Sequence, residues 1–434
     1  MIKRRNLLQG LGGVAMAPTF FQTLAAHEAM GGRTASGPIV VCIMLSGGND
    51  GLNTVVPLKQ YGAYTKLRSP SPSAPPANLN LVYNQEQLQT LAFDATPANS
   101  PGGATSFGFA PGMDAMRLLY AEGRLAVIAG VGLPAAETNP LSHQNGTWDW
   151  LTGRINIANS PTTGWLGLAL AGAGSGTLNT TTASFGGPVA LLNSTTAQAL
   201  VVNPPMDYFD ISYGTSDTYS KLQGIYAQMV SQPPNAAAAT YGQTQVQAAL
   251  ADIKTIKGYS KQVPAGNWNL PTYLDYQLRD IARLIAAKAG IRGFYAVQGG
   301  YDTHSSQALT QPLLLNQLSN SIAQFYYYLQ ATGNSSDVVI MTMSDFGRRP
   351  YANLSYGTDH GGSSVSFVLG DKVIGGVYGN YPSLTSFDPN GNLKLGVDFR
   401  NVLSDLIIHM SGDTTLPAAI IGQSFGQLGF LPHV

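Results

Sequence analysis

The sequence predicts an α/β fold in which a mostly parallel sheet is covered by helices on both faces. Apolar runs rich in β-branched residues, such as 37–45 and 338–343, have the composition of strands that are buried on both sides. Other segments, such as 271–289, repeat their apolar residues at helical spacing and therefore predict amphipathic helices. Buried strands that alternate with such helices are typical of a doubly wound sheet.

The predicted elements alternate along the chain. Strands are expected at 37–45, 125–131, 293–297, 338–343 and 365–369, and helices at 113–122, from 142 onward, and at 271–289, 314–329 and 399–411. The segment near 160–240 is rich in Thr, Ser, Gly and Asn, and is interpreted as a peripheral insertion. Because no internal repeat or clean linker is visible, residues 37–434 are predicted to form a single domain with loop insertions.

Residues 1–36 are interpreted as a twin-arginine signal peptide and a short linker. Lys3, Arg4 and Arg5 precede an apolar stretch, and small residues at 23–26 offer a cleavage site. The Arg4-Arg5 pair followed by Asn-Leu-Leu resembles the twin-arginine export motif. An uncleaved anchor is the alternative, but the stretch is shorter and richer in Gly than the ~20 apolar residues of a spanning helix. We expect a mature protein in the periplasm or outside the cell, without a stable membrane span.

The charge balance argues against a nucleic-acid partner. The chain carries 23 basic and 23 acidic residues, so its net charge is zero, whereas a nucleic-acid binder should show a basic excess. The only cysteine, Cys42, excludes an intramolecular disulfide and a cysteine-rich zinc site. Because Cys42 lies inside an apolar run, we expect it to be a buried core residue.

Carboxylates and imidazoles are found where the predicted strands end. Ligands of open α/β sheets bind beyond the carboxyl ends of the strands, so these side chains are expected to meet at one edge. Together they would form a mixed oxygen and nitrogen site for one or two divalent metal ions, with zinc, manganese or calcium as candidates. The candidate metal ligands are Asp50, Asp302, His304, Asp345, Asp359 and His360.

Each of these aspartates, taken alone, is more often a turn or helix-cap residue than a ligand. The motif Asp302-Thr303-His304 is more specific, because residues i and i+2 of an extended segment point to the same face and can share one ion. Its alternative is a Gly-Gly turn with a capping Asp. The metal hypothesis therefore depends on the joint placement of the residues.

Three further residues are candidates for catalysis: Ser142, His143 and Arg348. Ser142 is expected at a helix start, where backbone N–H groups favour an anion, and its hydroxyl beside a metal could act as a nucleophile. An ordinary N-cap is the equally weighted alternative. Arg348 could clamp an anionic group or pair with a surface carboxylate. The sequence lacks a nucleotide-binding glycine fingerprint, a P-loop and a Gly-x-Ser-x-Gly elbow.

Several motifs, in the same order and over nearly the whole chain, resemble one family of exported bacterial proteins, the domain-of-unknown-function family 1501. They are residues 45–57, 142–143, 164–167, 300–304, 344–348 and 359–361 (LSGGNDGLNTVVP, SH, GWLG, GYDTH, SDFGR and DHG). That family is similar to the alkaline phosphatase/sulfatase superfamily. The resemblance therefore implies an alkaline-phosphatase-like fold, with a doubly wound sheet and a two-metal hydrolytic site.

The resemblance also implies roles for single residues. Asp50 matches the metal-binding Asp after the first strand, and Ser142 falls where the superfamily keeps its nucleophile. Asp302 and His304 resemble an Asp and His pair of one metal site, although the superfamily spaces that pair more widely. Asp345 matches the Asp of a later Asp-His pair, and His360 matches the final His.

Two departures from the pattern weaken the expectation of a second metal. Phe346 stands where the superfamily has its paired His. Asp345 stands where the family commonly has Glu, which shortens the reach of that carboxylate. Asp359 is the residue that could supply a ligand in compensation.

The leading hypothesis is an exported, metal-dependent hydrolase of phosphate or sulfate esters, acting on an anionic ester small molecule or glycan. The alternative is a non-catalytic exported protein that keeps the fold for glycan binding or for assembly in the cell envelope. The family resemblance favours a partner, another exported protein encoded nearby. An oxidoreductase is a weaker hypothesis, because no nucleotide fingerprint supports it.

Overall fold

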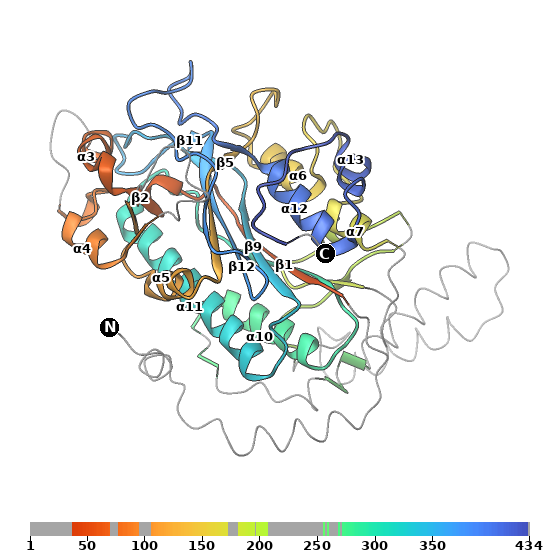
Figure 1. Cartoon of the computed structure of the whole chain (residues 1–434). Coiled ribbons are helices and arrows are strands. Elements are labelled where there is room, and N and C mark those ends of the chain that lie inside the picture. Colours follow the sequence, from red (N-terminus) through yellow and green to blue (C-terminus); the bar gives the residue numbers. More distant parts are fainter. Residues whose placement is uncertain are drawn as a thin grey trace, which may run out of the picture.

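Figure 1 shows the computed structural model of the chain, which describes residues 37–69, 77–94, 106–171, 181–195, 197–206 and 271–432, with a few positions between 255 and 269. Its centre is a sheet with the strand order β13-β5-β12-β9-β1-β8-β6-β7, and β14 also pairs with β5. These strands are β1 (Ile39–Leu45), β5 (Leu125–Gly132), β6 (Thr182–Ser184), β7 (Leu200–Val201), β8 (Gly293–Gln298), β9 (Val338–Ser344), β12 (Ser363–Gly370), β13 (Gly376–Tyr378) and β14 (Val397–Asp398).

The predicted α/β class with a mostly parallel sheet is confirmed. Strand β1 pairs in parallel with β8 and β9, and β5 pairs in parallel with β13 and β14. Only β12, among the described strands of this sheet, runs antiparallel to its neighbours, which are β5 and β9. All five strands predicted from the sequence are present.

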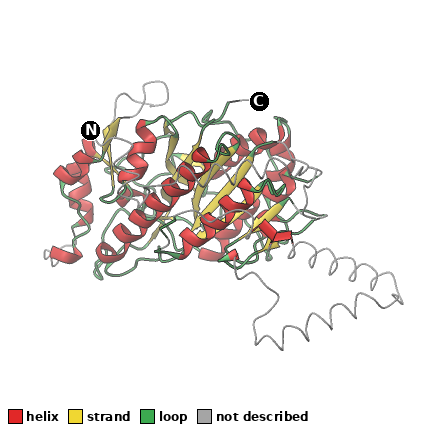
Figure 2. Cartoon of the chain, turned by 90° about the horizontal axis from the view of Figure 1, so that it is seen from below, coloured by secondary structure: helices red, strands yellow, loops and turns green. Residues whose placement is uncertain are grey.

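Helices cover both faces of the sheet, as Figures 1 and 2 show. The side chains of β1 alternate between two cores: Val41 and Ile43 belong to one, and Val40 and Cys42 to the other. This alternation follows from the two-residue period of a strand. The first core is completed by α5 (Asp114–Ala121), α10 (Tyr273–Ala286) and α11 (Gln307–Ala331), and the second by α6 (His143–Thr152), α7 (Trp165–Ala169), α12 (Phe399–Ser411) and α13 (Leu416–Ile421).

Cys42 is fully buried and free, as its apolar surroundings predicted. Burial raises the pKa of its thiol well above the usual range. The predicted signal segment 1–36 lies outside the described residues. Within the described part of the chain, no helix combines the length and the apolar character that crossing a membrane requires.

A second, smaller sheet forms between residues 55 and 109, where no strand was predicted. It has the order β2-β4-β3, from β2 (Val55–Pro57), β3 (Ala92–Asp94) and β4 (Ser106–Phe109). The helices α3 (Tyr61–Arg68) and α4 (Gln85–Thr90) and the short 3-10 helices η2 (Gly51–Asn53), η3 (Leu58–Gln60) and η4 (Ala77–Leu79) lie in the same part of the chain. A two-stranded ribbon joins β10 (Gly347–Arg348) to β11 (His360–Gly361).

The described part of the predicted insertion extends the central sheet beyond β8. Strand β6 pairs with β8 and extends the central sheet, and β7 pairs with β6. Trp165 and Leu166 of α7 are fully buried in the second core, beside the 3-10 helix η6 (Ala190–Leu192). The strands here are only two or three residues long and lie in Thr-, Ser- and Gly-rich sequence, so they gave no periodic signal. Most of the insertion beyond residue 206 lies outside the described residues.

The buried carboxyl group of Asp149, in α6, makes the stability of the fold depend on pH. Burial, together with the neighbouring charge of Glu137, raises the pKa of Asp149 to about 8, although Arg400 opposes the shift. An aspartate in the unfolded chain has a pKa of about 3.9, so between about pH 4 and 8 the folded state holds the extra proton. The contribution of Asp149 to stability is therefore fully present below about pH 4 and is lost as the pH rises towards 8.

We expect Asp149→Asn to remove this loss, since the amide stays uncharged at every pH. Its Tm should exceed that of the wild type by a few degrees at pH 8, and the difference should shrink at pH 5, because ~1 kcal/mol moves the Tm of a domain this large by ~2–4 °C. The exposed Asp114→Asn serves as a control for the change in net charge. Parallel Tm curves for wild type and Asp149→Asn would contradict the assignment.

Candidate metal centre

The loops that carry the predicted site residues meet at one edge of the central sheet. Strands β1, β8 and β9 are parallel, so their carboxyl ends lie at this edge. Strand β12 is antiparallel to β9, so the chain that leads into it, including β11, lies at the same edge. This reversal explains how a histidine that precedes a strand joins residues that follow strands.

Three ligand atoms form a tight triangle at this edge. The Nε2 atoms of His304 and His360 are 2.9 Å apart, and Oδ1 of Asp302 lies 3.2 Å and 3.3 Å from them. A tetrahedral zinc ion with bonds of about 2.0–2.1 Å separates its ligand atoms by roughly 3.3 Å. The triangle therefore fits a metal ion.

The second nitrogen of each imidazole is held by an acceptor. Nδ1 of His360 lies 2.9 Å from the carbonyl oxygen of Leu141, and Nδ1 of His304 lies 3.2 Å from Oδ1 of Asp359. Since a carbonyl oxygen only accepts, Nδ1 of His360 carries the hydrogen and Nε2 presents its lone pair to the triangle. Metal-binding histidines in proteins are typically oriented in this way.

Protonation states at the triangle also suit a cation. Burial alone would raise the pKa of Asp302, but the hydrogen bond and charge of Arg348, with the neighbouring histidines, hold it below its usual range. Burial, together with the charges of Arg348 and His143, lowers the pKa of His360. The carboxylate is therefore ionised and the imidazole neutral at pH 7, as metal ligation requires.

One side of the triangle is open to solvent. The side chains of Asp302 and His304 are 48% and 46% exposed, and only His360 is mostly covered, at 22%. Catalytic zinc sites keep one position free for water or substrate, whereas structural sites are closed by protein ligands. The exposure therefore leaves room for a further ligand of a bound ion.

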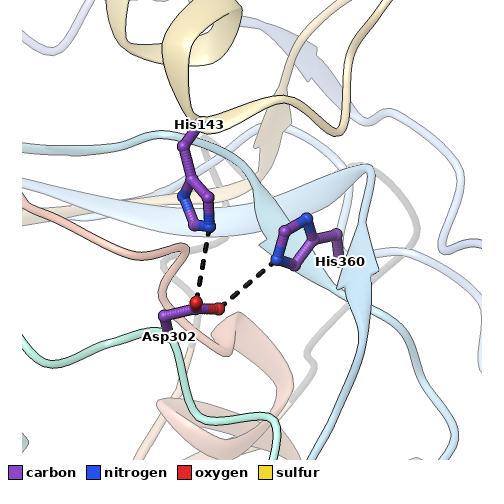
Figure 3. Close-up of side chains that lie close together, drawn as sticks. All are labelled: His143, Asp302 and His360. Carbon is purple, nitrogen blue, oxygen red and sulfur yellow. Dashed lines mark hydrogen bonds and ion pairs between the residues drawn. The ribbon is translucent and has the colours of Figure 1, made fainter.

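His143 is the first residue of α6, and Figure 3 shows its ring facing Asp302, which His360 also faces. Its Nδ1 is 2.7 Å from Oδ2 of the buried Asp345, and its Nε2 is 3.5 Å from Oδ2 of Asp302. The ligand atoms of His143, Asp302 and His360 lie within 4.8 Å of one another, a looser set than the triangle. Asp345 thus contacts His143, and also the backbone N–H of Gly47.

Phe346 fills the position where the superfamily pattern has a histidine. It is buried, and its ring centroid lies 4.7 Å from that of His143 and 4.2 Å from that of His360. A phenyl ring offers no lone pair to a metal, so it supports the two imidazoles by packing only. The described residues therefore provide a well-formed ligand set for one metal ion.

The structure favours a structural role for Arg348 over the predicted anion clamp. Its side chain is fully buried. Its guanidinium donates a hydrogen bond to Oδ1 of Asp302 at 2.6 Å. It also donates to the carbonyl oxygens of Gly47, Gly48, Tyr301 and Thr358. These bonds tie the loops after β1, β8 and β9 together.

Asp50 likewise lies outside the triangle. Its carboxylate caps η2 and is fully buried, with Arg68 Nη2 at 2.5 Å and Gln307 Nε2 at 2.5 Å. None of its hydrogen bonds or ion pairs in the described structure reaches Asp302, His304 or His360. The structure therefore favours a buried ion pair over the metal ligand that the family pattern implied.

Ser142 is the N-cap of α6, where its Oγ accepts from the backbone N–H of Asn145 at 3.3 Å. Both of its chain neighbours contact the cluster, Leu141 through its carbonyl and His143 through its ring. The predicted helix start is confirmed. The hydroxyl also donates to Oδ1 of Asn145 at 3.3 Å.

Four buried residues that support the site were not predicted from the sequence: Thr303, Gln307, Thr358 and Arg68. Thr303 and Thr358 were adjacent to predicted ligands, which was the only signal available for them. Nothing in the sequence distinguished Gln307 from the other glutamines.

The chain is similar to several solved structures, among them one named as a sulfatase and one named as an alkaline phosphatase. The PsFucS1 sulfatase from Pseudoalteromonas sp. is 11% identical, with a TM-score of 0.36 over 96% of this chain and 76% of that one. The alkaline phosphatase from the Antarctic bacterium TAB5 is 12% identical, with a TM-score of 0.31 over 79% of this chain and 95% of that one. The protein Ps i-CgsB, in complex with k-i-k-neocarrahexaose, is 10% identical, with a TM-score of 0.33 over 90% of this chain and 77% of that one.

Comparison with curated proteins finds no match. The family described as Protein of unknown function (DUF1501) matches residues 38–390, which include the strands β1, β8, β9 and β12 and all the predicted site residues. The chain belongs to that family.

Proposed function

We propose that this protein is an exported, metal-dependent hydrolase of phosphate or sulfate esters. The observation that carries the proposal is the triangle of Asp302, His304 and His360, which is open on one side and lies beside the start of α6. Export rests on the twin-arginine motif within residues 1–36.

Zinc suits the triangle better than the other candidate ions. Two imidazole nitrogens and one carboxylate oxygen form a common set of three protein ligands in catalytic zinc sites. Calcium prefers six to eight oxygen ligands, which this set does not offer. Bound zinc would polarise the ester and stabilise the negative charge that develops during hydrolysis.

The start of α6 supplies the groups that act on the ester. Ser142 Oγ is the nucleophile, since it stands between two residues that contact the cluster. The backbone N–H groups at the N-terminus of α6 favour the anionic phosphate or sulfate group beside it. The substrate is therefore an anionic ester, carried by a small molecule or by a glycan.

His143 moves the proton in this mechanism. Its Nδ1 is held by the Asp345 carboxylate at 2.7 Å, so Nε2 is the nitrogen that faces the site. A carboxylate in this position fixes the tautomer and orientation of an imidazole, as in hydrolases that use an Asp-His pair.

We expect Asp345→Asn to lower kcat about 100-fold while the zinc content stays unchanged. The amide oxygen can keep the bond from the backbone of Gly47, and the amide nitrogen then faces Nδ1 of His143. That nitrogen donates, so it favours the wrong tautomer of the ring; proton transfer by a side chain contributes about 10²–10⁴-fold to a rate. Elemental analysis and steady-state kinetics check the prediction, and a parallel loss of zinc would make Asp345 a metal ligand instead.

The proposal is tested on the purified wild-type protein. Elemental analysis should find one zinc per chain, and the zinc-loaded protein should hydrolyse 4-nitrophenyl phosphate or 4-nitrophenyl sulfate. Removal of zinc with a chelator should abolish the activity, and added zinc should restore it. Absence of bound zinc, or of turnover with both esters, would contradict the proposal.

A non-catalytic binding protein is the second candidate, and two observations favour it. Phe346 replaces one expected ligand, and Asp50 is engaged in a buried ion pair with Arg68. Such a protein would bind a glycan or another exported protein. Tight zinc binding without turnover of either ester would support it.

A further inference from the structure

We propose that Gln307 is a positioning residue that holds the two ligand loops in register, and that Asp50 and Arg68 hold Gln307 in turn. The ligand loops are 302–304 and 358–360, and the inference rests on the proposed metal site. Gln307 contacts no predicted ligand of the triangle, so it acts on the metal only through these loops.

Gln307 is the first residue of α11 and is fully buried. Its Oε1 accepts from the hydroxyl of Thr303 at 3.0 Å and from that of Thr358 at 2.6 Å. Thr303 lies between Asp302 and His304, and Thr358 lies two residues before His360. One amide oxygen therefore joins both loops that carry the triangle.

The orientation of this amide is fixed by Asp50. A carboxylate accepts hydrogen bonds and does not donate them, so Nε2 of Gln307 must face Oδ2 of Asp50, at 2.5 Å. Oε1 is then left for the two threonines. Arg68 Nη2 lies 2.5 Å from the other carboxylate oxygen, Oδ1, and forms a buried ion pair with it. The contacts form a chain from Arg68 through Asp50 and Gln307 to the two loops.

The loops touch where Gln307 joins them. The backbone N–H of Thr358 donates to the carbonyl of Thr303 at 3.2 Å. A Cβ atom on Gly357 would lie only 2.3 Å from the carbonyl carbon of His304, so the close approach requires glycine. Because the Nε2 atoms of the two histidines are only 2.9 Å apart, a small shift between the loops changes the triangle directly.

Gln311, one turn further along α11, is a matched control for Gln307. It is equally buried and also donates to Asp50, but to the backbone carbonyl at 3.2 Å, and to Oδ1 of Asn49 at 3.1 Å. Its bonds in the described structure reach neither ligand loop. Gln307→Met and Gln311→Met thus remove the same chemical group from the same helix.

We expect Gln307→Met to weaken zinc binding about 10- to 100-fold, which is the usual cost of losing a group that supports a metal ligand. Gln311→Met should bind zinc like the wild type, although both variants lose some thermal stability. Calorimetric titration of chelator-treated protein with zinc measures the affinities. Equal zinc affinities for the two variants would overturn the inference.

A charge swap tests the chain of contacts itself. Gln307→Glu places two carboxylates side by side and should weaken zinc binding like Gln307→Met. In the double variant Asp50→Asn with Gln307→Glu, the introduced amide can still accept from Arg68 and donate to the introduced carboxylate, which still accepts from both threonines. Every bond is thus kept while the charge moves one step along the chain of contacts, so the double variant should recover zinc affinity. A double variant no better than Gln307→Glu would overturn the inference.

Thr358→Val provides a second test if the Gln307 variants do not fold. It removes the 2.6 Å hydrogen bond and keeps the shape of the side chain. Weakened zinc binding supports the inference, and unchanged affinity overturns it. A wild-type protein that binds no zinc would instead contradict the proposed function, so the two failures are distinguishable.

Discussion

Asp302→Asn is expected to abolish both zinc binding and ester hydrolysis. Asp302 is the only carboxylate of the triangle, and its ionised Oδ1 lies 3.2 Å and 3.3 Å from the two imidazole nitrogens. The neutral amide loses the charge that attracts the ion but can still accept from Arg348, so the loops should stay tied. Zinc affinity should fall by more than ~100-fold, since even supporting residues of a metal site cost about 10- to 100-fold.

The matched control for Asp302→Asn is Asp359→Asn, which makes the same chemical change one step further from the triangle. Asp359 contacts Nδ1 of His304 at 3.2 Å and accepts from Asn353 at 3.0 Å. Its variant should bind zinc about 10- to 100-fold more weakly and recover turnover at saturating zinc. If Asp302→Asn kept one zinc per chain in elemental analysis, the triangle would not be the metal site.

Ser142→Asn should be inactive and yet as stable as the wild type. Asparagine is as good an N-cap as serine, so it can accept from the backbone of Asn145 while lacking the hydroxyl nucleophile. Ser142→Ala should be inactive as well, and less stable by about 1 kcal/mol because it loses the cap. For both variants we expect a fall in kcat of at least ~10³-fold, in the range that loss of a nucleophile causes in hydrolases.

The pair separates the two interpretations of Ser142 that the sequence left open. Thermal unfolding reports the cap, and hydrolysis of the two nitrophenyl esters reports the nucleophile. Turnover by Ser142→Asn at the wild-type rate would show that Ser142 only caps α6. Zinc content measured in parallel ensures that a loss of activity is not a loss of metal.

Much of the fold could be predicted because periodic patterns are local. The run 37–45 is apolar on both faces of the strand, and β1 does place Val41 in one core and Cys42 in the other. The helix at 399–411 was predicted with its observed bounds, and the structure adds Asp398 as its N-cap. Strands β6 and β7 were missed, because two or three residues are too few to show a period.

The candidate site could be predicted only in part. The rule that ligands gather at strand ends identified Asp302, His304 and His360, which the structure brings together. Asp50 satisfied the same rule equally well, but the structure pairs it with Arg68 of α3. No local pattern reveals which strand-end carboxylate turns towards solvent and which towards an arginine 18 residues away.

The sequence by itself determined the family, the α/β class and the set of residues from which a metal centre is built. Only the tertiary structure decided which of those residues share one site and how they are held. The physical reason is distance along the chain: the two histidines of the triangle are 56 residues apart, and Gln307 and Asp50 are 257 apart. Such contacts depend on how β12 reverses in the sheet and where α11 begins, and periodicity carries no information about either.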